Sequence, residues 1–289
     1  MADKVVSAEE QLETLNSDQL ALRGKHEKGL YLWNITMTVL HLVQACACLA
    51  IGSTSASLKQ FKLPLTTTFA VWTTGYPVPT LVTRGLIPFV QVTSAFSFLS
   101  AFFHLLVLIF WARYVSQIRR GINEFRWYEY SLSSSLMIFL ISLLFGIYDI
   151  ITLVNIFCIN ACMNYFGLLT EKMNPPNRTH TDFIAFWYGS FAGIVPWVSI
   201  FAYIGGVSSS SIPSFVWAIL FVYLFFFLTF PINMYLQYYR VGWWADRYYP
   251  GSGYYFGERV YQVLSLFSKS LLLWLVVGGA NQPNAYVVK

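Results

Sequence analysis

The chain has 289 residues, of which 56% are hydrophobic and 11% are charged, and its formal net charge is +5. Soluble domains carry roughly 25% charged residues, so this composition argues against a water-soluble globule and indicates a membrane protein. The basic residues are spread over several loops, which argues against nucleic-acid binding. Aromatic residues make up 19%, a share that suits interfacial belts and a pocket for a flat conjugated ligand.

The first 28 residues are charged and polar, and no short apolar core precedes a small-residue cleavage site. This segment therefore does not resemble a cleaved signal peptide. We interpret residues 1–28 as an N-terminal arm, in which Glu9 to Arg23 form either a short surface helix or a disordered stretch.

Seven apolar runs follow, each long enough to cross a hydrocarbon core of about 30 Å. The region 132–170 holds one formal charge, Asp149, and is too long for one span, so we divide it by a tight turn at 146–149. The predicted fold is an all-α seven-transmembrane-helix bundle over 29–281. Its predicted spans are 30–52, 86–112, 124–147, 150–171, 183–206, 213–238 and 256–279.

The longest loop outside these spans is 53–85. Its segments 61–73 and 80–83 are rich in Thr, Val and Phe, with Gly75-Tyr76-Pro77 between them. Two such segments around a turn signal predict a β-hairpin in the first extracellular loop.

The distribution of Lys and Arg predicts the orientation of the bundle. With the N-terminus inside, thirteen of the eighteen basic residues fall on the inner side, Arg126 among them, and four fall outside. The positive-inside rule therefore predicts a cytoplasmic N-terminus and an extracellular tail at 282–289. The predicted location is the plasma membrane or another cellular membrane.

Lys269 is the charge that the orientation count leaves over, because it lies near the centre of the seventh run. A charge in the bilayer centre costs about 2.5–3.5 kcal/mol on insertion scales, so it needs a reason. One interpretation is a lysine neutralised by burial or paired for packing. The other is an amine held in an apolar pocket, where its lone pair condenses with an aldehyde to give a Schiff base.

A charged Schiff base needs a counter-anion, and acidic residues near the membrane are few. Asp149, Glu171 and Glu258 occupy helix ends, so Glu129 is the one carboxylate that we expect to point into the bundle. The alternative for Glu129 is an interfacial glutamate one turn from Arg126.

His41 and His104 also fall inside predicted spans. Each is either a satisfied core histidine or part of a route that accepts or relays a proton near Glu129. The four cysteines, Cys46, Cys48, Cys158 and Cys162, are interpreted as small apolar packing residues, and no Cys/His spacing indicates a metal site. Gly189 and Gly193 form a small-xxx-small motif that predicts close helix packing.

Four separated motifs occur in order along the chain: 126–131 (RWYEYS), 160–168 (NACMNYFGL), 232–238 (INMYLQY) and 258–261 (ERVY), the last continuing through 264–270 (LSLFSKS). With these motifs the chain resembles the heliorhodopsins, microbial-type rhodopsins of inverted orientation, over nearly all seven spans. The chain departs from the family in a longer N-terminal arm and a longer segment around Pro250–Gly253.

The resemblance implies all-trans retinal bound covalently to Lys269, with Glu129 as counterion. Ser265 is implied as a hydrogen-bond partner near the Schiff base, and His41 and His104 as the family's inner histidines. The implied chromophore contacts are Asn160, Met163, Gly167, Phe227 and Trp187. The resemblance also implies a homodimer in which the first outer loop folds over the neighbour.

These observations predict a light-responsive photoreceptor that signals to an unknown intracellular partner and is not an enzyme. The alternative is light-driven or light-gated proton transport. Ser265 stands where pumping rhodopsins often carry Asp, and the third span offers a single carboxylate, which argues against pumping. A third class, a receptor for a diffusible ligand or a Schiff-base enzyme, predicts a colourless protein.

Overall fold

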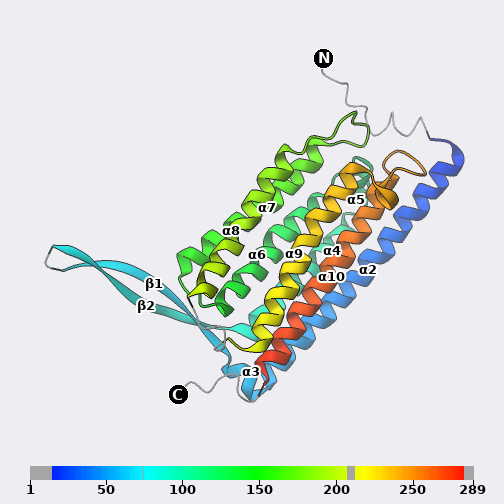
Figure 1. The fold of residues 1–289 in the computed structure, drawn as a ribbon. Coiled ribbons are helices and arrows are strands. Elements are labelled where there is room, and N and C mark those ends of the chain that lie inside the picture. The colour runs from blue at the N-terminus through cyan, green and yellow to red at the C-terminus, as the bar shows by residue number, and fades with distance from the viewer. Residues whose placement is uncertain (1–14, 74, 207–211, 283–289) are drawn as a thin grey trace.

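The computed structural model describes residues 15–73, 75–206 and 212–282. Within these ranges, seven helices are long and apolar enough to cross a membrane, and they form one bundle of roughly aligned helices (Figure 1). The prediction of an all-α seven-helix membrane protein with a hairpin is confirmed. The seven helices are α2 (Ser17–Thr54), α4 (Phe89–Ile109), α6 (Glu124–Leu144), α7 (Ile150–Met173), α8 (Ile184–Gly205), α9 (Ser214–Tyr239) and α10 (Ser252–Ala280).

Helix α2 is longer than predicted, because residues 17–28 of the predicted arm form its first turns. Asn16 begins the helix with a capping box: its side chain accepts from the Gln19 backbone N–H, and the Gln19 side chain accepts from the Asn16 N–H. Residues 1–14 of the predicted arm and 283–289 of the predicted tail lie outside the described residues.

The predicted hairpin is formed by β1 (Lys62–Thr73) and β2 (Tyr76–Pro88), which pair antiparallel beyond the short helix α3 (Ala56–Gln60). It projects sideways from the bundle end opposite to the start of α2 (Figure 1). The Thr66 backbone N–H donates to the Tyr148 carbonyl over 2.8 Å, so the hairpin base is tied to the turn between α6 and α7.

That turn lies where the sequence predicts it. Gly146 adopts φ 85°, a backbone conformation that favours glycine, and Asp149 caps α7 by accepting from the Thr152 N–H over 2.9 Å. The same backbone hydrogen bond lowers the pKa of the Asp149 carboxyl, since it stabilises the charged form.

Two further predicted spans have wrong bounds. The span predicted at 86–112 begins only at Phe89, because residues 86–88 extend β2, and it ends at Ile109, where a second helix follows, α5 (Trp111–Arg119). The last helix begins at Ser252 instead of 256, preceded by the short 3-10 helix η2 (Gly242–Trp244) and by Gly251 with φ 87°.

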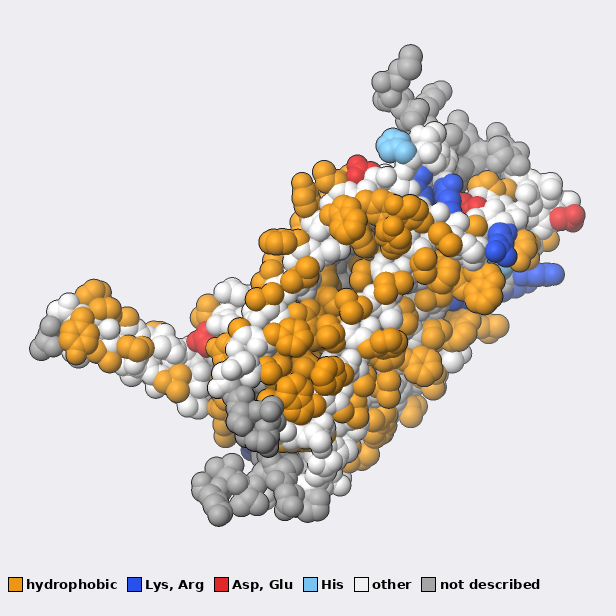
Figure 2. All heavy atoms as spheres, viewed as in Figure 1, with side chains coloured by type: hydrophobic (Ala, Val, Ile, Leu, Met, Phe, Trp, Pro, Cys, Tyr) orange, Lys and Arg blue, Asp and Glu red, His pale blue; other side chains and the backbone are white. Residues whose placement is uncertain are grey.

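Apolar side chains cover the flank of the bundle, while charged side chains gather at the end where α2 begins (Figure 2). This distribution is that of helices surrounded by lipid. Of the four cysteines only Cys48 is buried, whereas Cys46, Cys158 and Cys162 are exposed on the flank. Their prediction as packing residues is therefore wrong for these three.

Candidate functional site

Lys269 lies in the middle of α10 and is 2% exposed. Its Nζ donates to Glu129 Oε1 over 2.8 Å and to Ser265 Oγ over 2.6 Å, and it lies 5.1 Å from the centre of the Tyr130 ring. The free ammonium stands here in the place of the nitrogen that a Schiff base would present. Ser265 and Lys269 meet because they are four residues apart on one helix face.

Glu129 is brought to Lys269 from α6 and is 4% exposed. Its Oε1 also accepts from Ser100 Oγ of α4 over 2.6 Å and from Ser133 Oγ over 2.9 Å. The interfacial interpretation of Glu129 is therefore wrong. A buried ion pair is tolerated only when its remaining hydrogen-bonding capacity is satisfied, and the two serines satisfy it at the carboxylate.

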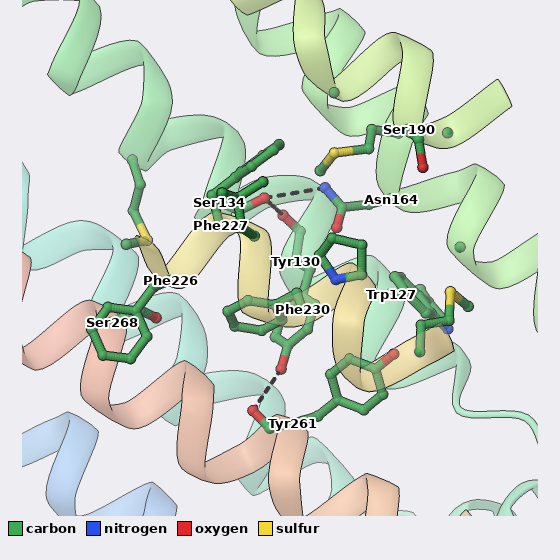
Figure 3. A pocket seen from close by; sticks show the side chains of 18 of the residues that line it. Trp127, Tyr130, Ser134, Asn164, Ser190, Phe226, Phe227, Phe230, Tyr261 and Ser268 are labelled. Carbon is green, nitrogen blue, oxygen red and sulfur yellow. Dashed lines mark hydrogen bonds between the residues drawn. The ribbon is translucent and has the colours of Figure 1, made fainter. Parts of the chain in front are cut away.

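A cavity of about 280 Å³ begins at Lys269 and Ser268 and extends between α6, α7, α8 and α9. Aromatic rings form much of its wall, as the close view shows (Figure 3). Its volume is near the lower end of the roughly 300–1,000 Å³ that small-molecule pockets span. The aromatic lining residues are Trp127, Tyr130, Phe186, Tyr223, Phe226, Phe227, Phe230 and Tyr261.

Glycines give this cavity its shape. A Cβ on Gly167 would lie 2.2 Å from the Trp127 ring, so the indole rests directly on the α7 backbone. A Cβ on Gly193 would lie 2.6 Å from the Met163 sulfur. Gly189 and Gly193 therefore do pack α8 against α7, as predicted, and both also line the cavity.

The two histidines lie beside the ion pair. Their rings stack with centroids 5.8 Å apart. Asn34 donates its amide N–H to the Leu30 carbonyl, so its Oδ1 faces His104 Nδ1 at 2.8 Å and accepts from it. His41 is fully buried, and neither of its ring nitrogens has a hydrogen-bond partner among the described residues.

Comparison with known families agrees with this geometry. The profile of the heliorhodopsin family matches residues 30–280, which is most of the chain. The chain belongs to the heliorhodopsin family. Membership makes it a retinal-binding, light-responsive, multi-pass membrane protein, with the chromophore bound to a lysine. No curated protein sequence matches the chain.

The cavity fits the chromophore that heliorhodopsin membership implies. Its wall is apolar and aromatic, as a conjugated hydrocarbon chain requires, and one end carries an amine paired with a buried carboxylate. Among the described residues, Lys269 is the lysine that lines it.

Some of the predicted chromophore contacts of this heliorhodopsin line the cavity and others do not. Met163, Gly167 and Phe227 line the cavity. Asn160 does not, because its amide donates to Ser134 and Ser135 between α6 and α7. Trp187 does not either, since it is 60% exposed on the outer side of α8. The neighbouring positions Asn164 and Phe186 line the cavity instead, because each lies on the inward face of its helix.

A charge cluster that the sequence did not predict lies at the end of the bundle where α2 begins. Glu171 and Glu258 are each 1% exposed, and both form ion pairs with Arg126, which is also buried. The expectation that Glu129 is the one inward carboxylate is wrong, and Arg126 is not a loop charge. The signal available in the sequence was one positive and two negative charges near those ends of α6, α7 and α10 that lie on the same side of the bundle.

A small cavity joins this cluster to the ion pair. It has a volume of about 20 Å³, enough for one water molecule. Its lining includes Glu258 and Arg126 of the cluster together with Glu129 and His104. Polar groups therefore continue from Lys269 to the end of the bundle where α2 begins.

Proposed function

We propose that Lys269 binds all-trans retinal as a Schiff base, that Glu129 is its counterion and that the protein is a light sensor. The position of Lys269 supports this proposal, because it is the lysine at the end of the aromatic cavity and it contacts a buried carboxylate. Bound retinal supplies absorption of visible light and a light-driven change of shape.

The protein's own residues determine where the proton is held. Glu129 Oε1 and Ser265 Oγ both accept from Lys269 Nζ, so they favour a proton on that nitrogen. Ser100 and Ser133 hold Glu129 in place from two helices. A change in the cavity next to Lys269 alters these contacts, and His104 is a nearby group that can take up or relay the released proton.

The distribution of ionisable residues favours signalling over transport. The half of each long helix toward the hairpin contains no Asp, Glu, Lys, Arg or His, in segments 43–54, 89–98, 135–144, 150–160, 195–205, 214–226 and 270–280. Within the helices, a proton released at Lys269 therefore has Asp, Glu, Arg or His side chains on one side only. With the predicted orientation, that side is cytoplasmic, where an intracellular partner is expected.

Proton transport remains the second candidate, and the cluster around Arg126 favours it. Pumping was expected to be disfavoured partly because a single carboxylate was predicted inside the bundle, whereas Glu171 and Glu258 are buried as well. Voltage-clamped cells separate the two candidates: a light-induced current that reverses with voltage supports transport, and the absence of current supports the sensor.

We also propose a homodimer held in part by the hairpin. An isolated two-stranded hairpin is marginally stable in water, and this one exposes Phe69, Trp72, Tyr76 and Leu81. A second copy of the chain beneath it would cover these side chains, in line with the predicted fold of the first outer loop over a neighbour.

The decisive experiment is a visible absorption spectrum of the protein purified after expression with all-trans retinal. Wild type and Lys172→Ala should both show a visible band, because Lys172 pairs at the surface with Glu124. Lys269→Ala should show none. Lys269→Arg should also show none, although it keeps a positive charge beside Glu129. A visible band in folded Lys269→Arg would refute the assignment of Lys269.

A further inference from the structure

A separate small cavity lies at the end of the bundle where α2 begins, between the loop that joins α7 to α8 and the junction of α9 with α10 (Figure 1). Its volume is about 20 Å³, which is room for one water molecule or a monatomic ion. Arg178 of the loop and Arg240, directly after α9, both line it. Neither arginine lines the large cavity at Lys269 or pairs with the carboxylates around Arg126.

Each of the two arginines reaches across to the segment of the other. Arg178 Nη2 donates to the Tyr238 carbonyl at the end of α9 over 2.9 Å, and Arg240 Nη2 donates to the Pro176 carbonyl in the loop. Arg240 has φ 54° and is the one described residue other than glycine with a positive φ. Glycine is usual at such a helix end, so an arginine there comes at a conformational cost.

Pro176 holds the loop in place at the cavity. A Cβ on Gly121 would lie 3.2 Å from the Pro176 ring, and one on Gly251 would lie 3.8 Å from it. Gly121 and Gly251 have φ 70° and 87°, which favour glycine, and both line the cavity. The cavity is therefore built by close packing of three turns, and it exists without a ligand.

The cavity has an excess of positive charge. Among the described residues, Arg178 has no carboxylate within 4.0 Å, and Arg240 pairs with Asp246 at 3.7 Å. Two guanidinium groups thus share one carboxylate. Burial and the nearby charge of Arg240 lower the pKa of Arg178, which means that its charged form is penalised by its surroundings.

The lining also offers hydrogen-bond donors that lack acceptors. Three of the five N–H groups of Arg178 are used, toward Thr181 Oγ1, the Pro175 carbonyl and the Tyr238 carbonyl. Tyr238 is 4% exposed, and its hydroxyl has no hydrogen-bond partner among the described residues. A water molecule would accept from such donors, whereas an anion would accept from them and also compensate the charge.

We propose that this cavity is an anion-binding site that takes chloride, held between the Arg178 and Arg240 guanidinium groups. Its volume suits a monatomic ion better than phosphate, sulfate or a carboxylate. Bound chloride compensates the excess positive charge and stabilises the contact between the α7–α8 loop and the end of α9. Tyr254 lines the same cavity and donates to Glu171, so the site adjoins the buried cluster around Arg126. The site does not depend on what Lys269 binds.

The first test is thermal unfolding of the purified full chain in sodium chloride and in sodium gluconate at equal ionic strength, because gluconate is too large for the cavity. The melting temperature of the wild type should rise with chloride and saturate, by roughly 3–5 °C at ten times the dissociation constant. Arg178→Gln should lose this rise. Arg113→Gln should keep it, since Arg113 is 66% exposed, pairs with Glu124 at the surface and does not line the cavity.

A second measurement needs no variant, so it decides the question even if Arg178→Gln does not fold. Crystals of the wild type grown in sodium bromide should show an anomalous bromide peak between the two guanidinium groups. An equal rise of the melting temperature in gluconate would indicate screening alone and overturn the proposal. A chloride-dependent rise that persists in Arg178→Gln, or a cavity without bromide, would overturn it as well.

Discussion

Substitution of Glu171 by Gln should strongly destabilise the protein, whereas the same change at the next residue, Lys172, should not. The two residues are adjacent in the last turn of α7. The Glu171 side chain has no exposed surface, while that of Lys172 is 46% exposed and pairs with Glu124 at the surface.

The expected loss of unfolding free energy depends on the hydrogen-bond donors that each substitution leaves without an acceptor. In Glu171→Gln, the new amide N–H₂ must face either Arg126 and Tyr254 or the Asn123 and Trp127 N–H groups. Each buried donor left without an acceptor costs about 1–3 kcal/mol, and removal of one partner from a buried ion pair costs about 3–5 kcal/mol. We therefore expect a loss of about 3–5 kcal/mol, against about 0–1 kcal/mol for the exposed pair in Lys172→Gln.

Thermal unfolding of both variants in the same detergent measures this difference. At roughly 2–4 °C per kcal/mol, Glu171→Gln should melt on the order of 10 °C below the wild type, and Lys172→Gln within about 2–4 °C of it. Equal melting temperatures for the two variants would refute the assignment of Glu171 as a fully satisfied buried carboxylate.

Three further predictions follow from the fold and the cavity. Gly167→Ala should displace the Trp127 ring, cost about 1–3 kcal/mol by overpacking and reduce pigment yield, whereas Gly278→Ala, where a Cβ meets nothing within 4 Å, should yield wild-type pigment. Asp149→Ala should cost about 1 kcal/mol through loss of the cap. Because the pKa of Asp149 is lowered in the fold, that contribution is present at neutral pH and lost as the pH falls through this pKa, so melting curves of variant and wild type should converge in acid. Deletion of residues 64–86 should convert a dimer to a monomer in light scattering, and a dimer that persists would contradict the proposed role of the hairpin.

Hydropathy and turn signals predicted much of the fold because each acts locally. The seven apolar runs, the turn at 146–149 and the hairpin depend on residues within a few positions of one another. The first turns of α2 were missed because they are polar: Arg23 is buried against the protein near the start of α2, which hydropathy cannot detect. The start of α4 was misplaced because the last residues of β2, 86–88 (LIP), are apolar and continue directly into the helix.

The residues of the candidate site were likewise predicted where local sequence signals sufficed and missed where tertiary packing decides. Motif resemblance and the rarity of charge in the membrane pointed to Lys269 and Glu129, and the structure places them 2.8 Å apart. Glu171 and Glu258 were assigned to helix ends, since a linear sequence does not show that three end turns meet around Arg126. Trp187 was misplaced because α8 is apolar all round, so only tertiary packing reveals that its neighbour Phe186 faces inward.

Trp127 contacts both the large cavity and the charge cluster around Arg126. The face of its indole ring forms the cavity wall against Gly167, and its ring nitrogen donates to Glu171 over 2.7 Å. Such a hydrogen bond leaves the usual range beyond about 3.2 Å, so a ring displacement of roughly half an ångström is enough to break it. A displacement of the indole from the cavity side would therefore change the hydrogen bonding of Glu171, the partner of Arg126.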